Sequence, residues 1–76
     1  MGNLVAIGEP VRVRGFALAG AVVLVAEDAE TARAAWRSMP DDTDVVILTP
    51  AAASALAQMT GAPNAPLVAV LPGGRR

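Results

Sequence analysis

The chain contains no cysteine, histidine, lysine or tyrosine, and only one phenylalanine and one tryptophan among its 76 residues. The absence of cysteine and histidine excludes disulfides, thiolate nucleophiles, zinc fingers and imidazole acid–base chemistry. Six arginines nearly balance seven acidic residues, so a net charge of −1 provides no basic surface for nucleic acid or an anionic membrane. The hydrophobic fraction of 54% is too high for a disordered chain.

Alanine and valine are abundant instead, with 17 and 10 copies. The length allows one small domain, which we place at residues 1–72. We predict a disordered tail at residues 73–76, because no local sequence signal there favours a helix or strand. A chain of this size buries only about 60% of its unfolded surface. Small side chains add little buried area each, so we expect marginal stability or support from a partner.

One apolar run, residues 16–26 (FALAGAVVLVA), follows Arg12 and Arg14. This order of positive charge and then an apolar segment is similar to that of a secretory signal peptide. The run is shorter than the roughly 20 apolar residues that a bilayer-spanning helix needs. As a signal peptide it would leave roughly 50 residues, fewer than most cores require. We therefore expect a cytoplasmic protein without direct membrane insertion.

Four apolar runs rich in β-branched residues predict strands at residues 4–7, 22–25, 45–48 and 67–71. None alternates apolar with polar residues, so all four are predicted to be buried on both faces, as in a parallel sheet covered by helices. Helical segments separate them, and right-handed crossovers then give a three-layer α/β/α fold. We predict a four-stranded parallel sheet of the Rossmann or flavodoxin-like type, with the first strand in its interior.

The first helix is expected to begin at Pro10 and to end before Gly20. Gly15 costs about 1 kcal/mol relative to alanine inside a helix, so this helix is predicted to be short or irregular. Its predicted apolar face consists of Val13, Phe16 and Ala17.

The two later helices have clear start signals. Asp28 is a predicted N-cap with Glu30 in the first turn, and Pro40 ends that helix. Thr49 is a predicted cap of the third helix, with Pro50 at its first position. The predicted buried faces are Ala29, Ala32, Trp36 and Met39 on the second helix, and Ala52, Leu56 and Met59 on the third.

The turn after the first strand, residues 8–15, is where this architecture often binds phosphate. A Walker loop ends in Gly-Lys-Ser/Thr, and the chain has no lysine. The dinucleotide fingerprint needs three closely spaced glycines, which are also absent. Glu9 would repel a phosphate at that helix start, so we interpret the segment as a tight strand-to-helix turn.

Acidic residues suggest a second possibility, a magnesium site of the phospho-receiver type. Ligands of α/β proteins bind at the edge of the sheet where the carboxyl ends of the strands lie. A receiver, however, carries its acceptor aspartate after a middle strand, where this chain has Thr49, and an acidic pair after the first strand, where it has Gly8 and Glu9. We interpret the acidic residues as helix capping and a solvated turn; they are Glu27, Asp28, Asp41, Asp42 and Asp44.

Nucleophilic catalysis has no base to support it. The hydroxyl side chains lack a histidine, lysine or cysteine to activate them, and they are Thr31, Ser38, Thr43, Thr49, Ser54 and Thr60. We therefore predict no catalytic, cofactor-binding or metal-binding residue and no cofactor. Phe16 and Trp36 are interpreted as core anchors. Arg12 and Arg14 are interpreted as solvated, with a partner contact as the open alternative.

Five segments, in order along nearly the whole chain, resemble the F subunit of the archaeal and bacterial A-/V-type rotary ATPases. The most specific are residues 5–9 (VAIGE) and 15–20 (GFALAG), a Gly-acidic turn followed by a Gly-Phe-x-Leu-Ala-Gly segment. Residues 27–32 (EDAETA) are similar to a helix start of the family. Residues 45–49 (VVILT) and 66–72 (PLVAVLP) are similar to its third and last strands.

The resemblance implies a non-catalytic central-stalk component that binds the coiled-coil D subunit and couples ATP turnover to ion or proton transport. It implies a cytoplasmic location, peripheral to the membrane through the ATPase complex. Family members usually continue into a regulatory C-terminal helical segment, so the sequence resembles a short form without that extension. Two alternatives stay open: a free-standing receiver-like regulatory or scaffold module without phosphorylation, and a small-molecule-binding domain.

Overall fold

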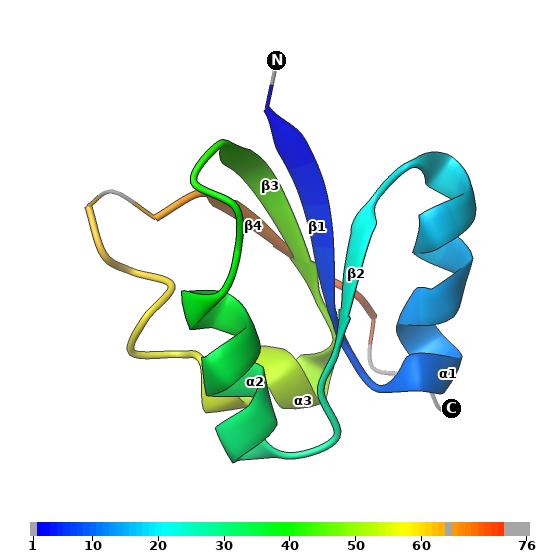
Figure 1. Cartoon of the computed structure of the whole chain (residues 1–76). Coiled ribbons are helices and arrows are strands. Elements are labelled where there is room, and N and C mark those ends of the chain that lie inside the picture. The colour runs from blue at the N-terminus through cyan, green and yellow to red at the C-terminus, as the bar shows by residue number, and fades with distance from the viewer. Residues whose placement is uncertain (1, 64, 73–76) are drawn as a thin grey trace.

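A computed structural model describes residues 2–63 and 65–72; the predicted tail at residues 73–76 lies outside this part (Figure 1). Four strands and three crossover connections alternate along the chain. The elements are β1 (Asn3–Gly8), α1 (Pro10–Val13), η1 (Arg14–Ala19), β2 (Val22–Val25), α2 (Ala29–Arg37), β3 (Thr43–Leu48), α3 (Pro50–Ala55) and β4 (Leu67–Val70).

The four strands form one sheet in the order β2-β1-β3-β4, and every neighbouring pair is parallel. In the pairing register, Val5 on β1 lies between Val22 on β2 and Val46 on β3. Val46 in turn pairs with Val68 on β4. The predicted α/β class, the parallel sheet and the interior position of the first strand are therefore confirmed.

Helices lie on both faces of the sheet (Figure 1). Helices α2 and α3 cover one face, while α1 and η1 pack against β1 and β2 on the other. The main core lies between the sheet and the α2–α3 pair. Its buried side chains are Val5, Ile7, Ala26, Ala32, Ala35, Val46, Leu48, Ala52 and Leu56.

The prediction that all four strands are buried on both faces is wrong for the outer two. The side chains of Val5, Ala6 and Ile7 on the central strand are inaccessible to solvent. On β4, however, Leu67 is 72% exposed and Val70 is 54% exposed. Strands β2 and β4 are the sheet edges, and an apolar run does not reveal whether its strand has neighbours on both sides.

The start signals of the helices are confirmed, and the first helix is irregular as predicted. Helix α1 has four residues and continues as a 3-10 helix, which ends at Gly20 with a φ of 90°. Two predicted buried alanines, Ala17 and Ala29, are exposed, whereas Ala35 is buried. Each helix has alanines on several of its faces, so the spacing of apolar residues does not reveal which face is buried.

No helix among the described residues is long and apolar enough to span a bilayer.

Candidate functional site at the carboxyl edge of the sheet

Strands β1, β2 and β3 end at the same edge of the sheet, the usual ligand position in α/β proteins. A hollow of about 270 Å³ lies there, beside the starts of α2 and α3. Alanine methyl groups form most of its wall, together with a few polar side chains. The lining residues are Glu9, Ala26, Glu27, Asp28, Ala29, Ala32, Ala51, Ala52, Ser54 and Ala55.

A hydrogen bond between neighbouring strand ends fixes one side of this edge. The hydroxyl of Thr49, which is inaccessible to solvent, donates to Oε1 of Glu9 at 2.6 Å. The same hydroxyl caps α3 by accepting from the backbone N–H of Ala52 at 3.4 Å. The hydrogen bond from Thr49, followed by a hydrogen bond from the backbone of Glu9 itself, lowers the pKa of Glu9 below its ordinary value of 4.5. Burial opposes this shift, and the nearby charge of Arg12 adds a smaller lowering effect. Glu9 therefore holds β1 and β3 together as an ionised carboxylate.

The close approach of these two side chains depends on Gly8. A Cβ atom at this position would collide with the side chain of Thr49, whose Oγ1 would lie only 2.6 Å away. Glycine at the end of β1 therefore makes room for the buried threonine at the end of β3. Sequence reasoning identified Thr49 as a cap but missed its contact with Glu9, because the two residues are 40 positions apart.

Asp28 is used to start α2. Its Oδ1 accepts hydrogen bonds from the backbone N–H and the hydroxyl of Thr31, both at 2.8 Å, and that hydroxyl also accepts from the backbone N–H of Asp28. The result is a complete capping box. These bonds lower the pKa of Asp28 below its ordinary value of 3.8. The predicted capping role is confirmed.

Five of the six hydroxyl side chains donate to protein oxygens. Thr49 and Thr31 donate to carboxylates, while Ser38, Thr43 and Thr60 donate to backbone carbonyls three residues earlier in the chain. Ser54 is the hydroxyl that lines the hollow. The charged side chains that line the hollow with it are all carboxylates, and a carboxylate stabilises cations rather than a phosphate.

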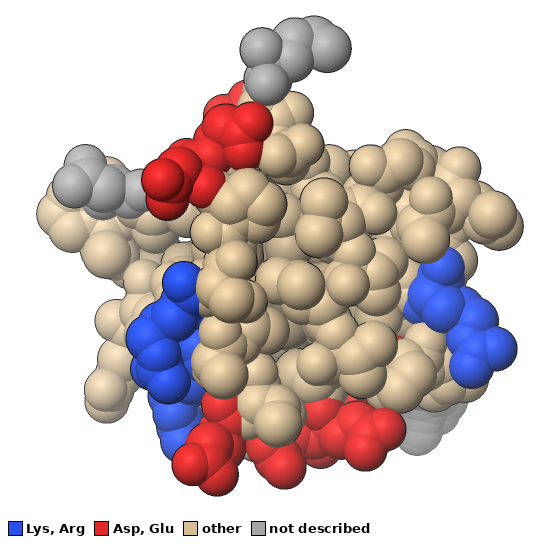
Figure 2. Space-filling view, in the orientation of Figure 1, with Lys and Arg blue, Asp and Glu red and all other residues tan. Residues whose placement is uncertain are grey.

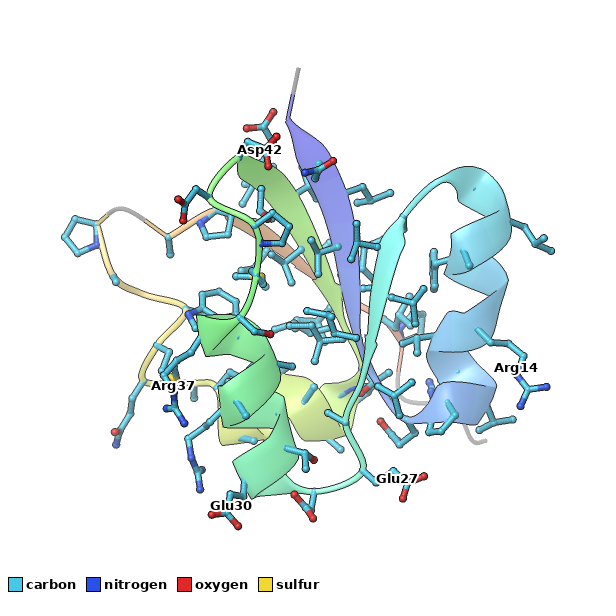
Figure 3. All side chains as sticks on the ribbon, in the orientation of Figure 1. Arg14, Glu27, Glu30, Arg37 and Asp42 are labelled. Carbon is cyan, nitrogen blue, oxygen red and sulfur yellow. The ribbon has the colours of Figure 1, made fainter. Side chains whose placement is uncertain are left out.

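Charge is sorted over the molecule, as Figure 2 shows. Acidic side chains gather along the carboxyl edge and at the opposite end, whereas arginines lie on the flanks. Figure 3 places Glu27 and Glu30 at the carboxyl edge and Asp42 at the far end of the sheet. Asp42 accepts a hydrogen bond from Asn3 there, at 2.6 Å. The two acidic groups of the sequence are thus kept apart, and no cluster of three potential metal ligands occurs among the described residues.

A second feature lies on the face that carries α1. Strand pairing places Val45, Ile47, Leu67 and Ala69 on the same side of the sheet as Ala6. Helix α1 and η1 pack over β1 and β2, so this part of β3 and β4 stays open in the structure as described (Figure 1). We call these four residues the open face. It carries no charge, and Leu67 within it is largely exposed.

Comparison of the chain with protein-family models, with curated proteins and with solved structures finds no match in any of the three.

Proposed function

We propose that this chain is a non-catalytic protein-binding subunit that acts through the open face of its sheet. The observation that carries the proposal is the exposure of Leu67, 72%, on an uncharged surface that also includes Val45 and Ile47. Parallel sheets are normally covered on both faces. A large apolar group left in water on such a sheet gains free energy when another protein covers it.

The carboxyl edge supports the same conclusion. Two of its polar groups are used to build the fold: Thr49 binds Glu9, and Asp28 caps α2. The walls of the hollow are mostly methyl groups, and its charges are all negative. Such a lining is a poor match for the nucleotides and phosphates that other α/β domains bind at this edge.

The assembly that we propose is the central stalk of a V/A-type rotary ATPase, with this chain in the role of the F subunit. Its partner is then a D-like coiled-coil subunit, and its task is to couple ATP turnover to ion transport at the cytoplasmic side of the membrane. The support is the resemblance of five sequence segments, which fall on β1, η1, the start of α2, β3 and β4.

A free-standing receiver-like regulatory or scaffold module is the second candidate. The strand order β2-β1-β3-β4, which is that of flavodoxin- and receiver-like folds, favours it. This alternative predicts a protein that is stable and functional without a D-like subunit.

Co-expression with the D-like subunit of a V/A-type ATPase from the same genome separates the two candidates. We expect a complex that survives purification, and we expect Leu67→Glu to weaken it at least about tenfold. Leu18→Glu is the matched control, because Leu18 is 94% exposed and lies on η1, outside the open face.

Absence of any complex with the D-like subunit contradicts the stalk role and leaves the scaffold module. A complex that tolerates Leu67→Glu as well as Leu18→Glu keeps the stalk role and refutes the open face as the binding surface. Circular dichroism of both variants verifies that each has folded.

A further inference from the structure

The outer edge of β4 carries backbone groups that make no hydrogen bond within residues 2–63 and 65–72. In a parallel ladder, the N–H and C=O of one residue point to the same neighbour, and those of the next residue point away. The N–H of Leu71 donates to Leu48 on β3 at 2.8 Å. Residues 67, 69 and 71 therefore point their backbone groups toward β3, and Val68 and Val70 point theirs outward, away from the sheet.

Prolines bracket this outward pair. Pro66 and Pro72 occupy the next two outward positions, and neither has an N–H to donate. The carbonyl of Pro72 already accepts a hydrogen bond from Arg12 at 2.8 Å. The outward donors of this edge are thus limited to Val68 and Val70, which also offer two carbonyls.

We propose that a second copy of this chain pairs with β4 in antiparallel orientation across a two-fold axis at Ala69. In this register Val68 of one copy faces Val70 of the other, and each such pair exchanges two N–H···O=C bonds. The four outward N–H and C=O groups of Val68 and Val70 in each copy are then satisfied. Shifting the register by two residues brings a proline opposite a valine and removes a donor, so the Ala69 register is the best one.

Side chains and charge fit the same pairing. Residues that face each other without hydrogen bonds approach to about 4.5 Å between Cα atoms. The axis places Ala69, the smallest residue of β4, at this closest contact. Residues 45–72 contain no charged side chain, so β4 and its flanking segments bring no like charges of their own together at a two-fold axis. Natural edge strands are protected from such pairing by charges, prolines, bulges or short length; β4 has no charge, and its short length and flanking prolines limit pairing to the Ala69 register.

The other edge of the sheet is less suited to a copy. On β2 the N–H of Ala26 points to β1, so Val23 and Val25 point outward. The next outward residue is Glu27, followed by Asp28, and pairing would remove these charges from water. Two of the four side chains of β2 are exposed, against three of four on β4.

The paired molecule would have a continuous eight-stranded sheet. Cross-strand neighbours lie on the same side of a sheet, so the open faces of the two copies join into one apolar surface with α1 at each end. This inference does not depend on the stalk assignment, because it uses the edge of β4 rather than its face.

The test is the oligomeric state of the full chain by sedimentation equilibrium at concentrations up to about 1 mM. We expect a monomer–dimer equilibrium. Val70→Pro removes one outward N–H and no bond to β3, and should weaken the dimer at least about tenfold. Val25→Pro is the matched control on β2: its valine is 53% exposed against 54% for Val70, and it should leave the dimer intact.

Charges introduced at Ala69 provide a test that does not rely on proline. Two Ala69→Lys chains place like charges at the axis, as do two Ala69→Glu chains, so each variant alone should be monomeric. An equal mixture of the two should form heterodimers. A monomeric wild-type chain, a dimer that survives both Val70→Pro and Ala69→Lys, or loss of the dimer in folded Val25→Pro overturns the proposal.

Discussion

Replacing Thr49 by valine tests how the two strand ends are held together. Valine keeps the shape of the side chain and removes the hydroxyl that donates to Glu9 and caps α3. A hydrogen bond to a charged group contributes about 1.5–3 kcal/mol and a cap typically about 1 kcal/mol. Glu9 is half-buried and regains water in the variant, and the cap bond is long. We therefore expect a loss near the lower end, about 2 kcal/mol.

A loss of this size is readily measured. A 76-residue domain has a stability of about 4–11 kcal/mol, and each kcal/mol shifts its Tm by about 4–8 °C. Thr49→Val should thus lower the Tm by about 8–16 °C. Urea unfolding can be followed by the fluorescence of Trp36, the single tryptophan, which packs against the core.

Thr60→Val is the matched control, because this hydroxyl only donates to a nearby backbone carbonyl at 3.4 Å. It should change the stability by less than about 0.5 kcal/mol. The pKa of Glu9 is lowered in the folded protein, so its contribution is present above the ordinary value of 4.5 and is lost as the pH falls through the folded value. The effect of Thr49→Val should therefore shrink as the pH is lowered from 4.5 through the folded pKa of Glu9. Equal effects of the two valine substitutions, or an effect that does not change with pH, would refute the reasoning.

Two further predictions concern the same edge. Gly8→Ala forces a methyl group against the side chain of Thr49 and should destabilise the protein by about 1–3 kcal/mol in urea unfolding. Gly15→Ala is the control: its methyl group meets open space, so it should be neutral or stabilising by up to about 1 kcal/mol. Asp28→Asn keeps a good capping residue but removes a carboxylate of lowered pKa. The stability of this variant should therefore fall less steeply than that of the wild type as the pH drops below 3.8, the ordinary pKa of aspartate. An unchanged dependence of stability on pH in this range would contradict the role given to the Asp28 charge.

The strands and the helix starts could be predicted from the sequence because their signals are local. Valine-rich runs mark each strand, and Asp28 and Thr49 cap the helices that follow them. The contact between Glu9 and Thr49 could not be predicted in this way. It arises only because β1 and β3 are neighbours in the sheet, which is a property of the strand order.

Exposure at the sheet edges could not be predicted for a related reason. The runs that become β1 and β4 are similar in composition, yet one lies at the centre of the sheet and the other at its edge. Which strand becomes an edge depends on where each crossover places it. The hydrophobic pattern of β4 therefore predicts a buried strand, and the structure leaves Leu67 in solvent.

The all-parallel sheet also has a consequence for how the molecule forms. Val5 pairs with Val22 and with Val46, and Val46 pairs with Val68, so no two strands can meet as a tight hairpin. Every ladder must close a loop of 17 residues or more before its hydrogen bonds repay the lost chain entropy. Domains dominated by such distant pairings fold on the order of milliseconds or slower, whereas small helical bundles of similar size can fold in microseconds.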